Sequence, residues 1–325
     1  MVHERRGEQP RMGLHSESQA PMPPVGRFAP SPSGPLHFGS LVAAVASYAE
    51  ARHRGGRWLL RIEDLDPPRT VPGAADDILR TLESHALLWD GPVVYQSRRT
   101  PAYRAALDRL SQQGDTYGCT CSRKQIAAVA RHGSSGYVYP GTCRGKPQPE
   151  PEPSAIRVRV SPIPVGFIDQ IHGHMQQNLE TEVGDFVVLR ADGIFAYQLA
   201  VVVDDADADV SQVVRGMDLF DSTPRQVYLQ RLLGLNTPNY VHVPLAVNRH
   251  GSKLSKMTQA PAVDLLRPST GLLAALRFLG QDPPTALSGE PPEAVLAWAV
   301  GHWALERVPG ESSLRAPDPS FEEST

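Results

Sequence analysis

In the first half of the chain, short apolar runs alternate with longer segments in which hydrophobic residues recur at helical spacing. This pattern predicts a strand at 25–28, a helix at about 38–54 and a strand at 58–62, followed by helical segments at 73–86 and 101–113. A strand, a helix and a second strand at this spacing form a right-handed parallel unit, which binds ligands at the carboxyl ends of its strands. The pattern therefore predicts an α/β fold.

The second half of the chain has shorter elements and no internal repeat. It predicts strands at 156–160, 185–190 and 199–203, a helix at 224–233, and a few helices within 263–279 and 292–305. The segment 145–154 is rich in proline and is expected to be an extended connector on the surface. Residues 1–24 and 312–325 are polar and show no periodicity, so both are expected to be disordered tails.

Composition narrows the class of protein. With 325 residues, 41% hydrophobic and 21% charged, the chain can form one large core or a core with a smaller module. No stretch approaches the ~20 apolar residues of a membrane helix, and the N-terminus lacks the apolar region of a signal peptide, so we expect a cytoplasmic protein. The net charge of −3 gives no global attraction to nucleic acid, and RNA binding would require a local basic patch.

The segment 29–40 has the composition of a turn that approaches a phosphate group. Small and proline residues fix its backbone, and Gly34 and Gly39 allow it to come close to a ligand. The apolar helix that follows places His37, Gly39 and Ser40 at its positive N-terminal end. This segment is a candidate binding site for the phosphates of ATP.

A second segment, Lys253-Leu-Ser-Lys256, places two ammonium groups on a loop, where they can meet a transferring phosphoryl group. The two segments together resemble the class I aminoacyl-tRNA synthetases, whose H-I-G-H and K-M-S-K-S signatures appear here as His37-Phe-Gly-Ser40 and Lys253-Leu-Ser-Lys-Met257. Three further stretches match the glutamyl branch of that class: Gly26-Arg-Phe-Ala-Pro-Ser-Pro-Ser-Gly34, Leu60-Arg-Ile-Glu-Asp-Leu-Asp66 and Tyr197-Gln-Leu-Ala200.

The resemblance implies a class I synthetase organisation. A Rossmann-like catalytic domain would span 25–260, with an insertion at about 115–150, and a small helical appendage would span 261–311. It also implies a chain that acts as a monomer on ATP, L-glutamate and tRNA.

The residues that would recognise glutamate follow from the charges of that amino acid and from the family's contacting positions. Two carboxylates and one ammonium require cationic donors, one anion and polar groups that fix the geometry. Arg27 and Arg215 supply the cations, Glu63 can hold the ammonium, and Tyr197 can form a hydrogen bond. The resemblance adds the rest of the segment that begins at Arg27, namely Phe28, Ala29, Pro30 and Ser31.

The resemblance also implies a mechanism. A glutamate carboxylate attacks the α-phosphate of ATP in line, forms glutamyl-adenylate and releases pyrophosphate. His37, Gly39 and Ser40 would contact ATP, and Lys256, supported by Lys253, would stabilise the transition state. Mg²⁺ would accompany ATP, because it commonly bridges phosphate oxygens.

Two positions depart from the family signatures. Ser40 replaces the second histidine of H-I-G-H, and Met257 replaces the final serine of K-M-S-K-S. A hydroxyl or a backbone N–H at a helix start can still contact a phosphate. Both changes are expected to slow adenylation without abolishing it.

All three cysteines, Cys119, Cys121 and Cys143, lie within 25 residues, and the remaining 300 residues contain none. In a cytosolic protein such clustering favours a metal over a disulfide, and a structural zinc ion needs a fourth ligand. His132, Tyr139 and a water are candidates for this ligand. The resemblance favours Tyr139, because family members of this kind carry Cys-x-Cys and Tyr-x3-Cys. The alternative is a chance cluster of buried thiols.

The segments after Lys256 are too short for the large anticodon-reading module of a glutamyl-tRNA synthetase. This chain resembles instead the glutamyl-queuosine branch, whose members attach glutamate to the queuosine base in the anticodon of tRNA(Asp). One alternative is a synthetase that charges the 3′ end of tRNA with the help of a separate subunit. Others are a non-catalytic RNA-binding relic and a nucleotidyltransferase acting on a small acid. Which hydroxyl accepts glutamate is left open.

Overall fold

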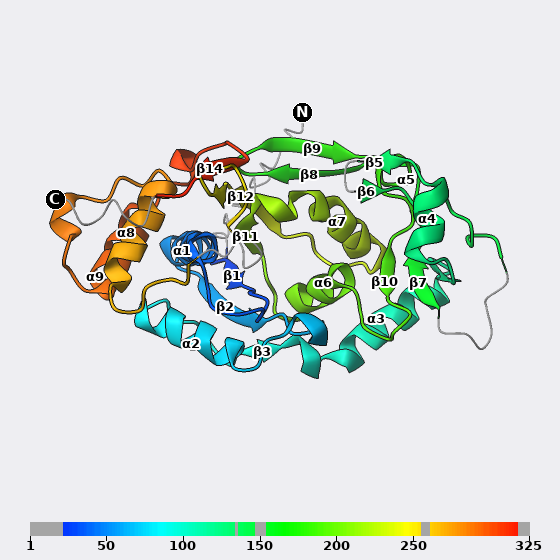
Figure 1. Cartoon of the computed structure of the whole chain (residues 1–325), viewed down its shortest axis with the longest axis horizontal. Coiled ribbons are helices and arrows are strands. Elements are labelled where there is room, and N and C mark those ends of the chain that lie inside the picture. Colours follow the sequence, from blue (N-terminus) through cyan, green and yellow to red (C-terminus); the bar gives the residue numbers. More distant parts are fainter. Residues whose placement is uncertain (1–21, 134–135, 147–153, 255–260, 318–325) are drawn as a thin grey trace, which may run out of the picture.

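Parallel strands with helices packed on them lie at the centre of the computed structural model (Figure 1). The structure describes residues 22–133, 136–146, 154–254 and 261–317. The strands β1 (Val25–Phe28), β2 (Arg57–Ile62) and β3 (Val94–Tyr95) form one sheet in the order β1-β2-β3, with Val25 opposite Arg57. Helix α1 (Phe38–His53) connects β1 to β2. The predicted parallel unit and the α/β class are confirmed.

A second sheet lies beside the first. Its order is β11-β12-β8-β9, formed by β11 (Gln212–Gly216), β12 (Asn239–Val243), β8 (Val165–Asp169) and β9 (Gly173–Gln177). The first three strands are parallel, and β9 runs antiparallel to β8. The two sheets meet where the backbone N–H of Ser211 donates to the carbonyl of Val25 at 3.0 Å. Strands β1 and β11 are thus neighbours, and residues at the carboxyl ends of both line one cleft.

Helix α1 belongs to a hydrophobic core that it shares with β1, β2, α2 (Ala74–Ser84), α8 (Pro268–Phe278) and α9 (Pro292–His302). It is buried on most sides because its interior is alanine-rich and admits close packing from both the strands and α8. The helices α8 and α9 thus pack directly on α1 (Figure 1).

A second hydrophobic core lies among α3 (Thr100–Gln112), α6 (Tyr197–Asp207), α7 (Thr223–Leu232) and the strands β8 and β11. The strand expected at 199–203 is wrong, because these residues form the middle of α6. All five are buried, so the apolar run carries no alternation that would separate a buried helix from a buried strand.

The segment expected as an insertion, at about 115–150, and the residues that follow it as far as 189 form the end of the molecule at the right of Figure 1. Its sheet has the antiparallel order β10-β7-β4, from β10 (Val187–Leu189), β7 (Ala155–Val158) and β4 (Thr116–Cys119). Two short helices and a hairpin flank it, namely α4 (Arg123–Val129), α5 (Leu179–Glu182), β5 (His132–Gly133) and β6 (Gly136–Tyr137).

Part of the segment expected to be a disordered tail, 312–325, is an ordered strand. Residues Ser313–Arg315 form β14, which pairs in parallel with β13 (Leu245–Val247). Leu314 packs against the core around α1, and this contact outweighs the polar composition of its neighbours. The expected tail at 1–24 lies largely outside the described residues, as do most of the proline-rich connector, the end of the second tail, Lys256 and Met257.

Several strands were missed by the sequence pattern. The strands β8, β9, β11 and β12 were not predicted, whereas those expected at 25–28, 58–62, 156–160 and 185–190 are present with shifts of up to two residues at their ends. The helices expected at 38–54, 73–86, 101–113 and 224–233 are present, and one helix lies within each of the two C-terminal segments. No helix in the described part of the chain is long and apolar enough to cross a membrane.

Candidate active site

A cleft of about 870 Å³ opens at the carboxyl ends of β1 and β11. Every predicted glutamate- or ATP-binding residue that the structure describes lines this cleft: Arg27, Phe28, Ala29, Pro30, Ser31, His37, Gly39, Ser40, Glu63, Tyr197, Arg215 and Lys253. They come from segments as far apart in the sequence as Arg27 and Lys253, and the fold brings them together. Lys256 lies outside the described residues.

His37 caps the N-terminus of α1. Its Nδ1 accepts a hydrogen bond from the backbone N–H of Ser40 at 3.3 Å, and its Nε2 lies 3.3 Å from the Ser40 hydroxyl. A Cβ atom at Gly39 would lie 3.3 Å from the His37 ring, so glycine allows this tight arrangement. Burial and the neighbouring Lys253 lower the pKa of His37, and a neutral imidazole therefore stands beside the positive helix end.

Lys253 also lines the cleft and forms an ion pair with Asp218. Asp218 belongs to a short 3-10 helix that follows β11. This pair ties the loop that carries Lys253 to the strand end that carries Arg215. Asp218 was not predicted from the sequence, because an aspartate in this short segment of mixed apolar and polar residues gives no signal of its own.

Arg27 is buried at the base of the cleft, where its charge is balanced by Asp205 of α6. The Nε atom of Arg27 donates to both carboxylate oxygens of Asp205, at 3.2 and 3.3 Å. Arg61 of β2 donates to the same carboxylate at 2.7 Å. Burial opposes ionisation of Asp205, but the two arginines outweigh it and lower its pKa. Asp205 thus holds Arg27 in place below the cleft.

Glu63 and Tyr197 form the polar wall beside Arg27. Burial raises the pKa of Glu63, against the opposing effect of Arg61, which donates to it at 3.4 Å. An arriving ammonium group would favour the ionised carboxylate. Burial and the nearby Glu63 raise the pKa of Tyr197 to about 12, so its hydroxyl remains a donor at neutral pH.

Arg215 projects from β11 into the same cleft and is 5% exposed. Its Nη atoms donate to Gln226 at 2.9 Å and to Thr223 at 2.8 Å, both on α7. The cleft therefore combines two buried guanidinium groups, one buried carboxylate and one phenol beside a helix N-terminus.

The three cysteines of the insertion lie together, with their Sγ atoms all within 4.8 Å of one another. The Tyr139 hydroxyl lies 3.3 Å from the Sγ of Cys119 and 3.7 Å from that of Cys121, and it accepts a hydrogen bond from the backbone of Cys143 at 3.0 Å. Ligands of a tetrahedral ion at ~2.3 Å stand about 3.8 Å apart. This donor set fits a metal ion.

His132, the other candidate for a fourth ligand, lies on β5, where it is exposed and packs against the ring of Tyr137. It is absent from the group of possible metal-binding residues in the described part of the chain. The guanidinium of Arg157 lies over the Tyr139 ring, 3.8 Å from its centroid. Tyr139 is thus fixed beside the cysteines.

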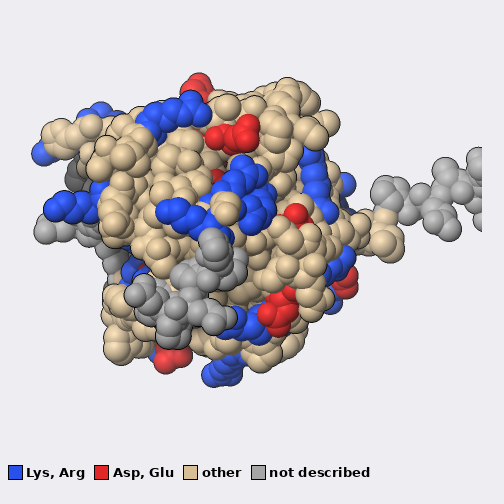
Figure 2. All heavy atoms as spheres, turned by 90° about the vertical axis from the view of Figure 1, so that its right-hand side faces the viewer, with Lys and Arg blue, Asp and Glu red and all other residues tan. Residues whose placement is uncertain are grey.

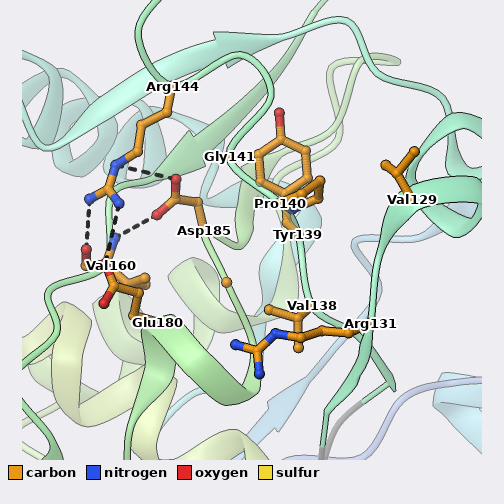
Figure 3. Close-up of a pocket in the computed structure, with 11 residues that line it drawn as sticks. Val129, Arg131, Val138, Tyr139, Pro140, Gly141, Arg144, Val160, Glu180 and Asp185 are labelled. Atoms are coloured by element: carbon orange, nitrogen blue, oxygen red, sulfur yellow. Dashed lines mark hydrogen bonds and ion pairs between the residues drawn. The ribbon is translucent and has the colours of Figure 1, made fainter.

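A second cavity, of about 470 Å³, lies beside this cysteine cluster (Figure 3). Arg144 crosses one side of it, donating to the carbonyl of Val160 at 2.7 Å and facing Asp185 at 3.6 Å and Glu180 at 3.8 Å. Figure 3 shows these groups directed toward one another. They connect the segment after the last cysteine to α5 and to the residues that precede β10.

Comparison with known proteins gives a matching family and close relatives. The model of the tRNA synthetases class I (E and Q), catalytic domain, matches residues 25–267. A glutamyl-Q tRNA(Asp) synthetase of Dechloromonas aromatica is 56% identical over 90% of this chain and 98% of its own length. One of Thiobacillus denitrificans is 54% identical over 91% of this chain and 98% of its own length.

Solved structures show a similar fold. A glutamate tRNA ligase of Elizabethkingia meningosepticum in complex with its amino acid superposes with a TM-score of 0.74 at 23% identity, covering 91% of this chain and 67% of that protein. A glutamate-tRNA synthetase of Elizabethkingia anophelis gives a TM-score of 0.72 at 23% identity, covering 89% and 67%. At this identity the likeness concerns the fold alone.

Proposed function

The chain belongs to the glutamyl-Q tRNA(Asp) synthetase family of class I synthetases, a family of ligases, and on this basis we propose that it activates L-glutamate with ATP and transfers glutamate to the queuosine base in the anticodon of tRNA(Asp). One observation carries the proposal beyond family membership. A single cleft holds both the charged groups that suit glutamate and the helix N-terminus that suits ATP phosphates.

In the activation step, an α-carboxylate oxygen of glutamate forms a bond to the α-phosphorus of ATP while the bond to the pyrophosphate oxygen breaks. Arg27, Arg215, Glu63 and Tyr197 hold the amino acid so that this attack is in line. The N-terminus of α1, capped by His37, receives negative charge on the phosphates. Mg²⁺ that accompanies ATP neutralises further charge on the phosphate oxygens.

In the transfer step, a hydroxyl of the modified base attacks the carbonyl of glutamyl-adenylate, and AMP leaves with the bonding electron pair. The hydroxyl proton passes to solvent or to a phosphate oxygen of the departing AMP. The lysines of the 253–256 loop are assigned to the first step, in which charge grows on the phosphoryl oxygens. We assign no covalent nucleophile to a side chain.

Glutamate-dependent exchange of labelled pyrophosphate into ATP tests the activation step. We expect exchange with glutamate but not with glutamine or aspartate, because the cleft pairs two guanidinium groups with a ligand of defined length and charge. The assay is run with and without unacylated tRNA. If neither condition gave exchange, or if glutamine served as well as glutamate, the proposal would be wrong.

The metal proposed for the cysteine cluster is one structural zinc ion held by Cys119, Cys121, Cys143 and the Tyr139 hydroxyl. Hydrogen bonds from Tyr139 and the neighbouring groups outweigh burial and lower the pKa of Cys143 to about 7, whereas burial raises the pKa of Cys121. The ion would join β4 to the segment after β6 and stabilise the insertion.

Replacing Cys119 with serine is expected to remove most of the zinc, measured per chain by atomic emission after gel filtration. Tyr139→Phe should weaken retention of zinc in a chelator titration, because one donor is lost. The matched variant His132→Gln should retain zinc like the unmodified protein. A folded wild-type protein free of zinc, or loss of zinc in His132→Gln alone, would contradict this assignment.

A basic surface on the insertion supports the proposed RNA partner. The described residues between 116 and 160 contain seven basic and no acidic side chains, although the whole chain has a net charge of −3. Four of the seven are exposed, namely Arg123, Lys124, Arg131 and Lys146. Of the others, Arg157 is buried, Arg159 is partly buried, and Arg144 pairs with Asp185 and Glu180. Figure 2 shows this end of the molecule, with lysine and arginine side chains gathered near the middle of the face. Such a surface suits backbone phosphates.

Reversing the charge of one exposed side chain there tests this surface. Lys124→Glu on α4 should weaken tRNA binding and reduce the slope of log affinity against log salt by about one. Filter binding at several salt concentrations measures both quantities. Arg277→Glu, exposed on α8, is the control and should change neither. Equal effects of the two variants would mean that only net charge matters.

A further inference from the structure

The guanidinium of Arg215 donates hydrogen bonds to several side chains, and one of these is the buried His242. In the register of the parallel strands, Arg215 of β11 lies opposite His242 of β12, and Asp169 at the end of β8 lies opposite Tyr240, two residues before His242. Residues two positions apart on a strand project from the same face. The three side chains therefore project from one face of the sheet.

The distances join these side chains in a chain of hydrogen bonds. The Nε–H of Arg215 donates to Nε2 of His242 at 3.0 Å, and Nδ1 of His242 lies 2.7 Å from Oδ2 of Asp169. The side chains of His242 and Asp169 are fully buried. Because Arg215 has no acceptor, Nε2 of His242 must be the unprotonated nitrogen, and Nδ1 must carry the proton that Asp169 accepts.

The charge of the imidazole agrees with this tautomer. Burial lowers the pKa of His242 to about 4, although Asp169 favours the cation and Arg215 opposes it. The ring is therefore neutral at physiological pH. Two aromatic rings hold the orientation of the imidazole. The Tyr240 ring lies parallel to it, with the ring centroids 6.2 Å apart, and the Phe220 ring meets it edge-on, with the centroids 5.0 Å apart.

Asp169 is fixed by its second carboxylate oxygen. Its Oδ1 accepts the backbone N–H groups of Ile171 and His172, each at 3.0 Å. Hydrogen bonds to His242 and to these N–H groups outweigh burial and lower the pKa of Asp169. These backbone N–H groups thus fix the Asp169 carboxylate, the carboxylate fixes the His242 ring, and the ring fixes the guanidinium of Arg215.

We propose that Asp169 and His242 are positioning residues for glutamate recognition: they hold the Nε edge of Arg215 and so fix the orientation of the guanidinium that lines the cleft. This inference rests on the proposed function, because it gives Arg215 the role of binding glutamate. Gln226 and Thr223 take further N–H groups of Arg215, which leaves few orientations open to the guanidinium. The carboxylate ligand then meets a preorganised donor.

The substitution Asp169→Asn tests the positioning role because it keeps the shape of the side chain and replaces the acceptor that faces His242 with an amide donor. Its Oδ1 can still accept from Ile171 and His172, which directs the amide N–H toward Nδ1 of His242. The ring must then carry its proton on Nε2, where it opposes the Nε–H of Arg215 at 3.0 Å and faces the Thr223 hydroxyl at 3.2 Å. We expect the half-saturating glutamate concentration in pyrophosphate exchange to rise about tenfold or more, the scale of an unmatched buried donor. That for ATP should stay within about twofold.

Two further variants sharpen the test. His242→Gln places an amide oxygen where it can accept from Arg215, and it should restore part of the affinity for glutamate that His242→Phe loses. His172→Gln is the control, since the His172 side chain contacts the backbone carbonyl of His242 and not its ring nitrogens. It should leave the glutamate requirement unchanged within about twofold. Equal rises in the glutamate and ATP requirements of Asp169→Asn, or no rise, would overturn the proposal.

Nitrogen-15 NMR of the histidine-labelled wild-type protein gives a readout that does not depend on the folding of variants. We expect the His242 signals of a neutral ring protonated on Nδ1 at pH 7. A ring protonated on Nε2, or on both nitrogens, would overturn the proposal even if every variant were unstable. A wild-type protein that gives no glutamate-dependent exchange would contradict the proposed function instead, and the tautomer would still decide whether this chain of hydrogen bonds exists.

Discussion

Replacing Arg215 with alanine should lower kcat/KM for glutamate in pyrophosphate exchange by about 10- to 150-fold, while the half-saturating ATP concentration changes little. The loss corresponds to a hydrogen bond between charged groups in a buried site, about 1.5–3 kcal/mol. Arg215 is 5% exposed and held by Gln226, Thr223 and His242, so its guanidinium is buried and oriented before the ligand binds.

The specificity of the effect distinguishes a ligand-binding arginine from a structural one. Arg231→Ala on α7 removes a guanidinium that donates to the carbonyl of Gly166 on the surface, outside the residues that line the cleft, and is the matched control. It should alter kcat/KM for glutamate by less than about twofold. If Arg215→Ala impaired ATP and glutamate use equally, with unchanged stability, Arg215 would not be part of the glutamate pocket.

Replacing Asp205 with alanine should lower the free energy of unfolding by about 3–5 kcal/mol, because it leaves the buried charges of Arg27 and Arg61 without their shared partner. The pKa of Asp205 is below its usual value, so its stabilising effect is complete at neutral pH and disappears as the pH falls through that lowered pKa. Urea unfolding at pH 7 and at lower pH measures both effects.

Asp207 provides a control on the same helix, two residues away. It forms an ion pair with Arg99, but its side chain is 54% exposed, so Asp207→Ala should cost less than about 1 kcal/mol. A comparable loss in both variants would show that helix α6, and not the buried carboxylate, determines the effect. Retained stability in Asp205→Ala would mean that Arg27 and Arg61 find other partners or water.

The sequence predicts local elements well where periodicity and end signals agree. Helix α1 is an example, because its apolar run begins directly after His37 and ends before Gly55. It fails for α6, whose five-residue apolar run has no polar face to reveal a period. It also misses β11, since Gln212 and Arg215 place polar side chains in a buried strand. Their burial depends on partners supplied by other segments.

In the candidate site too, some residues could be predicted from the sequence and others could not. Motif residues such as His37 and Arg27 were found from the sequence, and they line one cleft. Their buried partners, Asp205, His242 and Asp169, were not found, because each acts through a contact with a residue far away in the sequence. An Asp-Asp pair directly after an apolar run was the available signal for Asp205. This pair of aspartates indicates a buried carboxylate only when basic side chains are known to lie beside it in the fold, as Arg27 and Arg61 do here.

The acceptor of glutamate is the most direct test of the central claim. The purified protein is incubated with ATP, Mg²⁺ and labelled glutamate, using matched tRNA pools with and without queuosine, and nuclease digestion then locates the label. We predict label on the modified anticodon nucleoside, and none in the pool that lacks queuosine. Label on the 3′-terminal adenosine in both pools would contradict the account and identify an enzyme that charges tRNA.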